Sequence, residues 1–273
     1  MLSVRHSRRE PNRYERTVWS WDGTAWKQAA PLPFPRSSHR VVYHAARSSF
    51  ILFGGGFGRA VRAEGVLWEW RGGEWKAVGG NFQAGRDEPA MCYDQRNGRV
   101  VIFGGWDASS AYRGETWEWV DEGLVQVDSV GPSPRAGHAF HYDTVRQRCL
   151  LFGGRGVDGY LADTWEWDGA AWHRLAQMGP SARWFFGSTA DPANGRIVLF
   201  GGSGPDGDLR DTWAWNGDRW EQLSTEGPAA RGMAKLAPSG HSIILFGGRQ
   251  ANPNGFQDRN DTWELQGLAW VRR

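Results

Sequence analysis

Five short runs of apolar residues recur along the chain, and each is followed by two glycines. The runs are 51–53, 100–103, 150–152, 197–200 and 243–246. Uninterrupted apolar runs of this length are typical of strands that are buried on both faces. The paired glycines permit a backbone bend that a side chain would obstruct. We therefore expect five buried strands, each ending at a bend.

The tripeptide Phe-Gly-Gly at the end of each run recurs at a nearly constant interval. Its Phe residues are Phe53, Phe103, Phe152, Phe200 and Phe246, so the successive steps are 50, 49, 48 and 46 residues. A repeat of about fifty residues made of short strands is the sequence signature of a β-propeller whose blades are the repeats.

Tryptophans follow each apolar run at fixed offsets. A Trp-x-Trp pattern begins at Trp68, Trp117, Trp165, Trp213 and Trp263, with Leu265 as the second member of the last copy. Five residues after the second position stand Trp75, Trp172, Trp220 and Trp270, whereas Leu124 takes this place in one repeat. Residues two apart in a strand point to one face, and pairs such as Asn216-Gly217 predict hairpin turns. These tryptophans are therefore expected on the third and fourth strands, packed between neighbouring blades.

The first strand of each repeat precedes the apolar run, as at 139–142, so each repeat predicts four antiparallel strands. An extra Trp19-Ser20-Trp21 has no Phe-Gly-Gly before it, and the segment from Val18 to about Gln28 predicts two strands only. The predicted fold is all-β, with five complete four-stranded blades plus an N-terminal half-blade. Six radial positions are expected in an incompletely closed ring, because neither end supplies the first two strands of the half-blade.

The repeats resemble the kelch repeat over almost the whole chain from about residue 17. The resemblance rests on the Gly-Gly doublet, the Trp-rich third and fourth strands, and Arg135-Ala136-Gly137-His138 at the start of a first strand. It implies a kelch-type β-propeller, similar to the central domain of galactose oxidase-like proteins. Kelch propellers include interaction scaffolds, lectin-like modules and a few enzymes, so the resemblance is more specific for fold than for function.

Charge separates the N-terminus from the rest of the chain. Residues 1–16 carry five arginines and two glutamates, a local charge of +3, whereas the whole chain has a formal charge of +2. We predict a polar basic tail over 1–16 and a propeller over 17–273. A propeller with a charge near −1 does not favour nucleic-acid binding. The sequence has no apolar stretch of membrane-spanning length and no signal-peptide core, which predicts a cytoplasmic protein, or an exported one if upstream sequence is missing.

The sequence contains few candidates for catalysis or metal binding. Cys92 and Cys149 lie in predicted strands and are interpreted as packed thiols rather than as a disulfide or a nucleophile. The seven histidines are scattered, and the chain lacks a zinc motif, a P-loop and a nucleophile elbow in a suitable context. We therefore expect no catalytic residue, metal or cofactor, although residues that the fold brings together could still form an enzyme site.

An arginine precedes every predicted first strand, and we call these five residues the first-strand arginines. They are Arg36, Arg86, Arg135, Arg183 and Arg231. In an antiparallel blade, the segment before the first strand and the loop after the second lie on one rim. The loops that share this rim are 56–66, 106–115, 155–163, 203–211 and 249–261. The arginines either bond the adjacent blade for structural reasons or form a concave site for anions or acidic peptides.

These observations favour a non-catalytic scaffold that binds a protein or peptide, including acidic ones, through this rim. The predicted binding residues are Arg36, Arg86, Arg135, Arg183, Arg231, Trp184 and Trp106. Trp106 and Trp184 are included because they stand outside the repeated Trp positions, although Trp106 could equally pack within its loop. The alternative is a carbohydrate-binding module or a sugar-processing enzyme, which the aromatic content and the kelch resemblance both allow.

Overall fold

A computed structural model describes residues 2–4, 16–21, 26–56, 65–81, 83, 85–120, 123–127, 130–175, 178–191 and 193–273. The described chain is all-β, and it includes the short 3-10 helix η1 (Ala45–Arg47). Most of the expected tail, residues 5–15, lies outside the described residues, as does most of the first long loop, 57–64. The chain divides into two compact units, residues 1–93 with 98–128 and residues 94–97 with 129–273.

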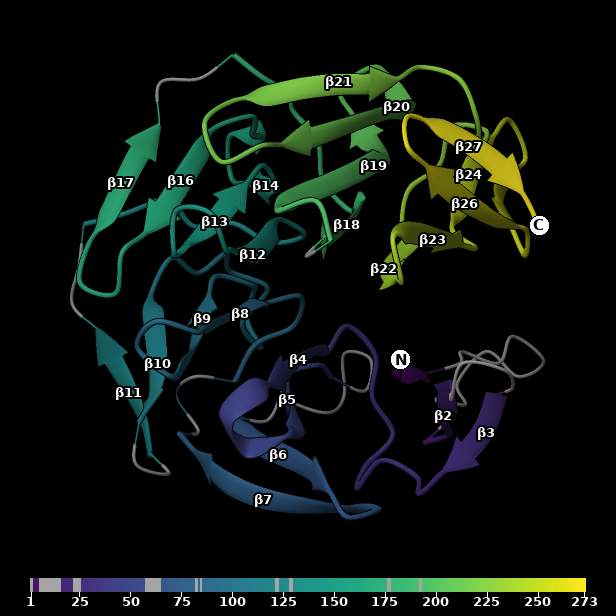
Figure 1. Cartoon of the computed structure of the whole chain (residues 1–273). Helices are drawn as coiled ribbons and strands as arrows, with labels where there is room; N and C mark the ends of the chain where they lie inside the picture. The colour runs from purple at the N-terminus through teal and green to yellow at the C-terminus, as the bar shows by residue number, and fades with distance from the viewer. Residues whose placement is uncertain are drawn as a thin grey trace. The chain divides into compact units, whose positions relative to one another are not determined.

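The first unit contains a three-stranded N-terminal sheet and two four-stranded blades (Figure 1). The N-terminal sheet consists of β1 (Leu2–Val4), β2 (Val18–Trp21) and β3 (Trp26–Ala29). The first blade consists of β4 (Arg40–His44), β5 (Ser49–Phe53), β6 (Val66–Arg71) and β7 (Glu74–Gly80). The second consists of β8 (Ala90–Asp94), β9 (Arg99–Phe103), β10 (Thr116–Val120) and β11 (Gly123–Val127).

The second unit contains three four-stranded blades. The first of these consists of β12 (Ala139–Asp143), β13 (Arg148–Phe152), β16 (Thr164–Trp167) and β17 (Trp172–Leu175). The next consists of β18 (Gly187–Asp191), β19 (Arg196–Gly204), β20 (Gly207–Trp215) and β21 (Trp220–Ser224). The last consists of β22 (Lys235–Ser239), β23 (Ser242–Phe246), β26 (Thr262–Gln266) and β27 (Ala269–Arg272). Two short hairpins project from the loops, β14 (Arg155–Gly156) with β15 (Gly159–Tyr160), and β24 (Arg249–Asn252) with β25 (Gly255–Asp258).

Each of the five blades is an antiparallel meander in which strands pair in chain order, as predicted from the repeats. The Gly doublets produce the expected bend. Gly154 has a φ of +98°, and a Cβ placed there would lie 2.8 Å from the Cβ of His138. Glycine is required because a side chain would be both strained and obstructed at this position.

The N-terminal sheet differs from the expected two-stranded half-blade. β1 pairs with β2 in an antiparallel register that places Ser3 opposite Trp19, so the sheet has three strands. Part of the segment expected to form a polar tail therefore belongs to this sheet. The physical reason is that an unpaired strand edge offers backbone donors and acceptors that a short extended segment can satisfy. The closure of the ring stays a prediction.

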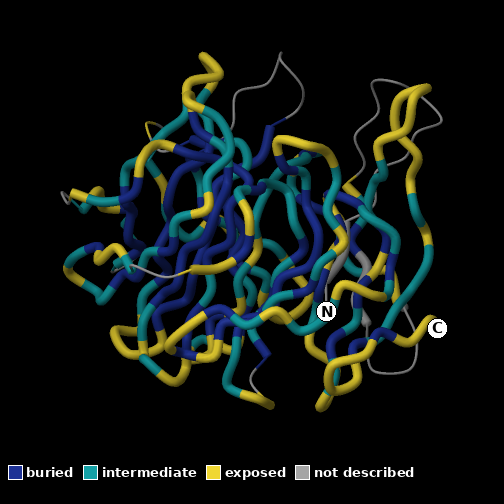
Figure 2. The backbone as a smooth tube through the Cα atoms, turned by 90° about the horizontal axis from the view of Figure 1, so that it is seen from above, coloured by how far each residue is buried: buried dark blue, intermediate teal, exposed yellow. Residues whose placement is uncertain are grey.

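Buried residues concentrate on the strands, whereas exposed residues lie mainly at loop tips (Figure 2). In the second unit Trp220 and Trp270, both on fourth strands, pack against the preceding repeat, as expected. The ring of Trp220 lies 5.0 Å from that of Phe152, and its Nε1 donates a hydrogen bond of 3.0 Å to Thr164 Oγ1. Trp270 repeats this arrangement with Phe200 and Thr212. Each indole thus joins two consecutive blades by both packing and a hydrogen bond.

The interpretation of the cysteines as packed thiols is wrong. Both Cys92 and Cys149 are disulfide-bonded, and neither is a free thiol. Cys92 is on β8 and Cys149 is on β13, and both side chains are buried. A disulfide depends on the distance and direction between two Cβ atoms, which the spacing of cysteines in the sequence does not reveal.

Candidate functional site

The structure places all five first-strand arginines in the protein interior. The exposed fractions are 3% for Arg36, 4% for Arg86, 0% for Arg135, 0% for Arg183 and 1% for Arg231. Of the two interpretations that the sequence left open, this burial agrees with the structural one. A buried guanidinium needs partners for its N–H donors. The identity of those partners shows what the arginines do.

Each first-strand arginine of the second unit forms a bidentate ion pair with the aspartate that stands two residues before the first Trp of the Trp-x-Trp pattern. The Nη1–Oδ1 and Nη2–Oδ2 distances are 2.6 and 2.9 Å for Arg135–Asp163, 2.7 and 2.8 Å for Arg183–Asp211, and 2.5 and 3.0 Å for Arg231–Asp261. The planar guanidinium matches the two carboxylate oxygens in this arrangement. Each aspartate also accepts a 2.7 Å hydrogen bond from an indole, that of Trp165, Trp213 or Trp263.

Arg183 illustrates how these residues join successive repeats. Its Nη1 donates to the carbonyl of Gly201 in its own repeat at 3.0 Å. Its backbone N–H donates to Leu161 and its carbonyl accepts from Gly154, both in the preceding repeat, at 3.1 and 2.8 Å. Arg231 makes the corresponding backbone contacts with Leu209 and Gly202. The contacts therefore support the structural interpretation of the arginines.

The ion pairs keep the aspartates ionised. Burial by itself would raise the pKa of Asp163 and of Asp211, but the hydrogen bonds and charges of Arg135 and Arg183 outweigh it, so both pKa values lie below the ordinary value. The hydrogen bond from Arg231 lowers the pKa of Asp261 to about 2, against the opposing effect of burial. Each aspartate is consequently ionised at neutral pH.

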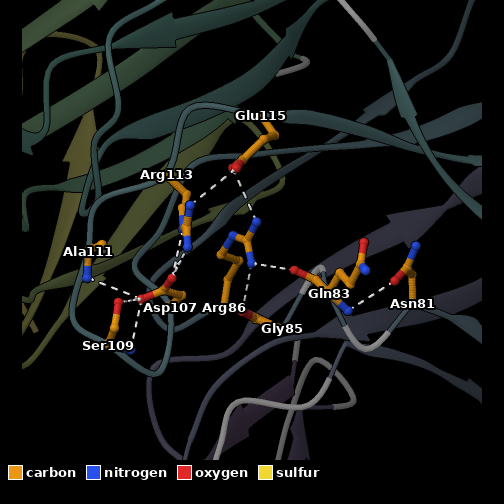
Figure 3. Close-up of polar contacts among 9 residues, drawn as sticks. All are labelled: Asn81, Gln83, Gly85, Arg86, Asp107, Ser109, Ala111, Arg113 and Glu115. Carbon is orange, nitrogen blue, oxygen red and sulfur yellow. Dashed lines mark hydrogen bonds and ion pairs between the residues drawn. The ribbon is translucent and has the colours of Figure 1, made fainter.

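The second blade of the first unit uses a glutamate, Glu115, where the second unit uses an aspartate. Nη2 of Arg86 lies 3.1 Å from Glu115, and Nη1 donates to the carbonyls of Gln83 and Gly85 at 2.9 Å each (Figure 3). Glu115 also lies 3.7 Å from Arg113. In the first blade Val66 stands at the corresponding sequence position, and Nη1 of Arg36 donates to the carbonyl of Gly54 at 3.2 Å. The arginine is therefore present in all five repeats, whereas the residue at the aspartate position varies.

Trp106 belongs to a loop that is folded against itself. It is half-buried, pairs by its backbone with Asp87 and Tyr112, and its ring lies edge-on to Tyr112 at 5.8 Å. Asp107 fixes the same loop through hydrogen bonds from Ser109 and an ion pair with Arg113 (Figure 3). These contacts favour the loop-packing interpretation of Trp106 over that of an exposed anchor.

Asp87, beside this loop, has an unusual carboxyl group. Burial and, to a smaller extent, the neighbouring charge of Glu88 raise the pKa of Asp87 to about 6, although a backbone hydrogen bond from Gly56 opposes the change. Glu88 is itself paired with Arg40 at 2.6 Å. Asp87 therefore titrates close to neutral pH.

The residue two positions after each first-strand arginine adopts a left-handed backbone conformation. These residues are Ser38, Glu88, Gly137, Phe185 and Met233, with φ between +49° and +64°. In the second unit they form a chain of hydrogen bonds, in which Phe185 N–H donates to Gly137 at 3.0 Å and Met233 N–H donates to Phe185 at 2.6 Å. Non-glycine residues in this conformation are strained, and such strain is concentrated at functional sites.

Four residues of the second unit gather around Trp184, and we call Arg155, Tyr160, Trp184 and Phe185 the Trp184 cluster. The guanidinium carbon of Arg155 lies 5.1 Å from the ring centre of Trp184 and 5.3 Å from that of Tyr160. Trp184 stacks on Phe185 with ring centres 4.1 Å apart and meets Tyr160 edge-on at 6.2 Å. All four side chains are half-buried, so one side of each is open to a partner.

The Trp184 cluster combines two successive repeats. Arg155 and Tyr160 come from the hairpin β14–β15, whereas Trp184 and Phe185 precede β18 in the next repeat. The sequence singled out Trp184 and the loop 155–163 but missed Arg155, Tyr160 and Phe185 as individual residues. The available signal was the position of Arg155 directly after a Gly doublet, where the loop leaves the second strand.

The same end of each blade carries the long loops, as predicted. Backbone bridges join the residue after each first-strand arginine to the start of the following loop. They are Ser37–Gly56, Asp87–Trp106, Ala136–Arg155, Trp184–Ser203 and Gly232–Arg249. Loop tips on this end of the second unit expose apolar side chains, including Val157 at 86%, Phe256 at 63% and Met233 at 42%. This end therefore offers both apolar and polar contacts.

Residues 114–270, more than half of the chain, match the family model of the KLHDC2/KLHL20/DRC7 Kelch-repeats domain. The chain belongs to the kelch-repeat family. No curated protein matches this kelch chain. All three Arg–Asp pairs of the second unit and the whole Trp184 cluster lie within the matched kelch residues, and the fold class is accordingly the kelch β-propeller.

In the described part of this kelch protein, no group of three or more His, Cys, Asp or Glu side chains is placed to hold a metal ion. None of the helices in the same residues is long and apolar enough to cross a membrane.

Proposed function

We propose that this kelch protein is a binding scaffold that recognises a protein or peptide through the Trp184 cluster and the loops beside it. The loops are 155–163, 203–211 and 249–261. The observation that carries the proposal is the half-buried Trp184 cluster, whose aromatic rings and guanidinium are held against each other. Trp, Tyr and Arg are the residues that contribute most to binding energy at protein interfaces.

Rigid aromatic side chains bind at a small entropic cost because few rotamers are lost on association. Trp184 is held by Phe185, Tyr160 and Arg155, so its orientation is fixed before a partner arrives. The strained backbone of Phe185 lies next to it. These features support a contact surface that is formed in advance.

The first-strand arginines have a supporting role in this proposal. The buried ion pairs of the second unit tie the segment before the first strand to the third strand of the same blade. The backbone of Arg183 and of Arg231 bonds in addition to the preceding repeat. Together these contacts fix the positions of the loops. The partner would meet the loops and the Trp184 cluster rather than the charges of Arg135 or Arg183. This assignment changes the binding residues expected from the sequence while it keeps the same end of the blade.

A selection with random peptides displayed on phage tests the proposal. We expect the native protein to enrich families of related peptides, and the variant Trp184→Ala to lose at least tenfold in affinity for them without a change in its melting curve. Tyr43→Ala provides a matched control, because Tyr43 is an exposed aromatic residue on β4 of the first unit. Undiminished binding to Trp184→Ala would overturn the proposed surface. A silent peptide selection with a positive glycan array would favour the carbohydrate alternative.

A further inference from the structure

We infer that Arg155 recognises an acidic side chain, Asp or Glu, in the protein segment that this scaffold binds. The inference rests on the proposed function and adds the chemistry of the partner. Arg155 lies at the start of β14, directly after the Gly doublet. Its backbone pairs in both directions with Ala136, at N–O distances of 2.9 and 3.0 Å, so the base of the side chain is fixed.

The guanidinium of Arg155 is positioned by aromatic rings rather than by a carboxylate. It lies over Tyr160 and Trp184, at 5.3 and 5.1 Å from the ring centres. Across the described residues, no Asp or Glu oxygen comes within the 4.0 Å that defines an ion pair with Arg155. Contact with a ring engages the flat face of a guanidinium and leaves N–H donors at its edge.

Other arginines on the same loops are neutralised locally. Arg249 lies 3.3 Å from Asp258, and Arg210 lies 3.2 Å from Glu226. Arg155 therefore differs from its neighbours in having a fixed, half-buried positive charge without a carboxylate among its described contacts. A charge that is partly removed from water and held in place interacts strongly with an opposite charge in a ligand.

The surroundings favour a carboxylate over a doubly charged group such as phosphate. The other members of the Trp184 cluster are uncharged aromatic residues, and a single guanidinium matches one carboxylate in a bidentate pair. Met233, which donates its N–H to the carbonyl of Phe185, continues the surface with an exposed apolar side chain. The segment that fits this surface thus presents an acidic residue near an apolar one.

A double-mutant cycle tests the inference with peptides obtained from the phage selection. On the native protein, replacing the peptide Glu or Asp by Gln or Asn should weaken binding about 10- to 100-fold, as expected for a hydrogen-bonded charge. On Arg155→Gln the same peptide change should have no further effect. Arg174→Gln is the matched control, because Arg174 is an exposed arginine on β17 of the same blade.

The outcomes separate the inference from the proposed function. The role of Arg155 would be overturned if the selected peptides lack an acidic residue. It would also be overturned if replacing that residue by its amide weakens binding equally on the native protein and on Arg155→Gln. Either result leaves the scaffold proposal intact. A phosphoserine in place of the acidic residue that binds more tightly in an Arg155-dependent manner would also overturn the choice of a carboxylate. Failure of any peptide to depend on Trp184 would instead count against the proposed function itself.

Discussion

Arg183 and Asp211 form a bidentate ion pair across 28 residues of sequence, although the guanidinium is fully buried and the carboxylate is only partly covered. The backbone of the same arginine bonds to the preceding repeat through Leu161 and Gly154. One residue thus connects the segment before a first strand, the third strand of the same blade and the adjacent blade. The same ion pair recurs at Arg135 and Arg231.

Removal of this arginine is expected to destabilise the protein strongly. Arg183→Met would leave the carboxylate of Asp211 without its cationic partner, and breaking one side of such a pair costs about 3–5 kcal/mol. Chemical denaturation should therefore show a lower free energy of unfolding by about this amount. Arg174→Met, at an exposed position, should change it by less than about 0.5 kcal/mol. Equal effects of the two variants would contradict the structural role of Arg183.

The Arg–Asp pairs predict a loss of stability in acid. Asp163, Asp211 and Asp261 have pKa values below the ordinary value of 3.8 in the folded protein, about 2 for Asp261. Because the unfolded chain then binds protons more tightly, the three aspartates add to the free energy of unfolding above about pH 4. This added stability is lost as the pH falls towards about pH 2. Urea denaturation across this range should show the decline. Asp261→Asn should be less stable at pH 7 and should decline less steeply, and a parallel decline would refute this assignment.

Asp87 predicts a pH dependence of the opposite sign. Its folded pKa of about 6 lies above the ordinary 3.8, so ionisation disfavours the folded state above about pH 6. The penalty that Asp87 imposes on the free energy of unfolding should therefore become smaller as the pH falls from about 7 to about 4. Asp87→Asn should be more stable than the native protein at pH 7, and the difference should shrink by pH 4. Asp158→Asn, at an exposed loop tip, is the control for the removal of a carboxylate.

The Phe residues of the Phe-Gly-Gly repeats should differ in their contribution to stability. Phe200 is completely buried under Trp270 of the next repeat, whereas Phe246 in the last repeat is 50% exposed. Phe200→Ala should cost about 3–5 kcal/mol, as for other fully buried aromatic residues. Phe246→Ala should cost less than half as much. Similar losses in thermal and chemical denaturation would show that Phe246 is covered in solution.

The left-handed positions predict a specific need for glycine at residue 137. Gly137 has a φ of +64°, and a Cβ there would lie 3.2 Å from the ring of Phe185. Gly137→Ala should therefore destabilise the protein by about 1–2 kcal/mol. Met233→Gly relieves the same strain at an exposed position and should be neutral or stabilising by up to about 1 kcal/mol. Equal destabilisation by the two changes in chemical denaturation would contradict this explanation.

The amino-acid sequence determined the blades. The spacing of Phe152 and Phe200 gave the repeat, the uninterrupted apolar runs gave the buried second strands, and the Trp positions gave the third and fourth strands. These predictions succeed because strand periodicity and turn chemistry are local properties, and because repetition makes each local signal visible five times. The packing of Trp220 on the preceding repeat followed from the same regularity.

Only the tertiary structure decided which side chains are buried, paired or open to a partner. The sequence placed Arg135 and Arg183 correctly at the start of their strands but could not show that aspartates 28 residues later neutralise them. The sequence also did not show that Cys92 is disulfide-bonded, or that the guanidinium of Arg155 packs on the ring of Trp184 from the next repeat. Such contacts depend on distances between residues far apart in the chain, which the three-dimensional arrangement of neighbouring strands and loops sets.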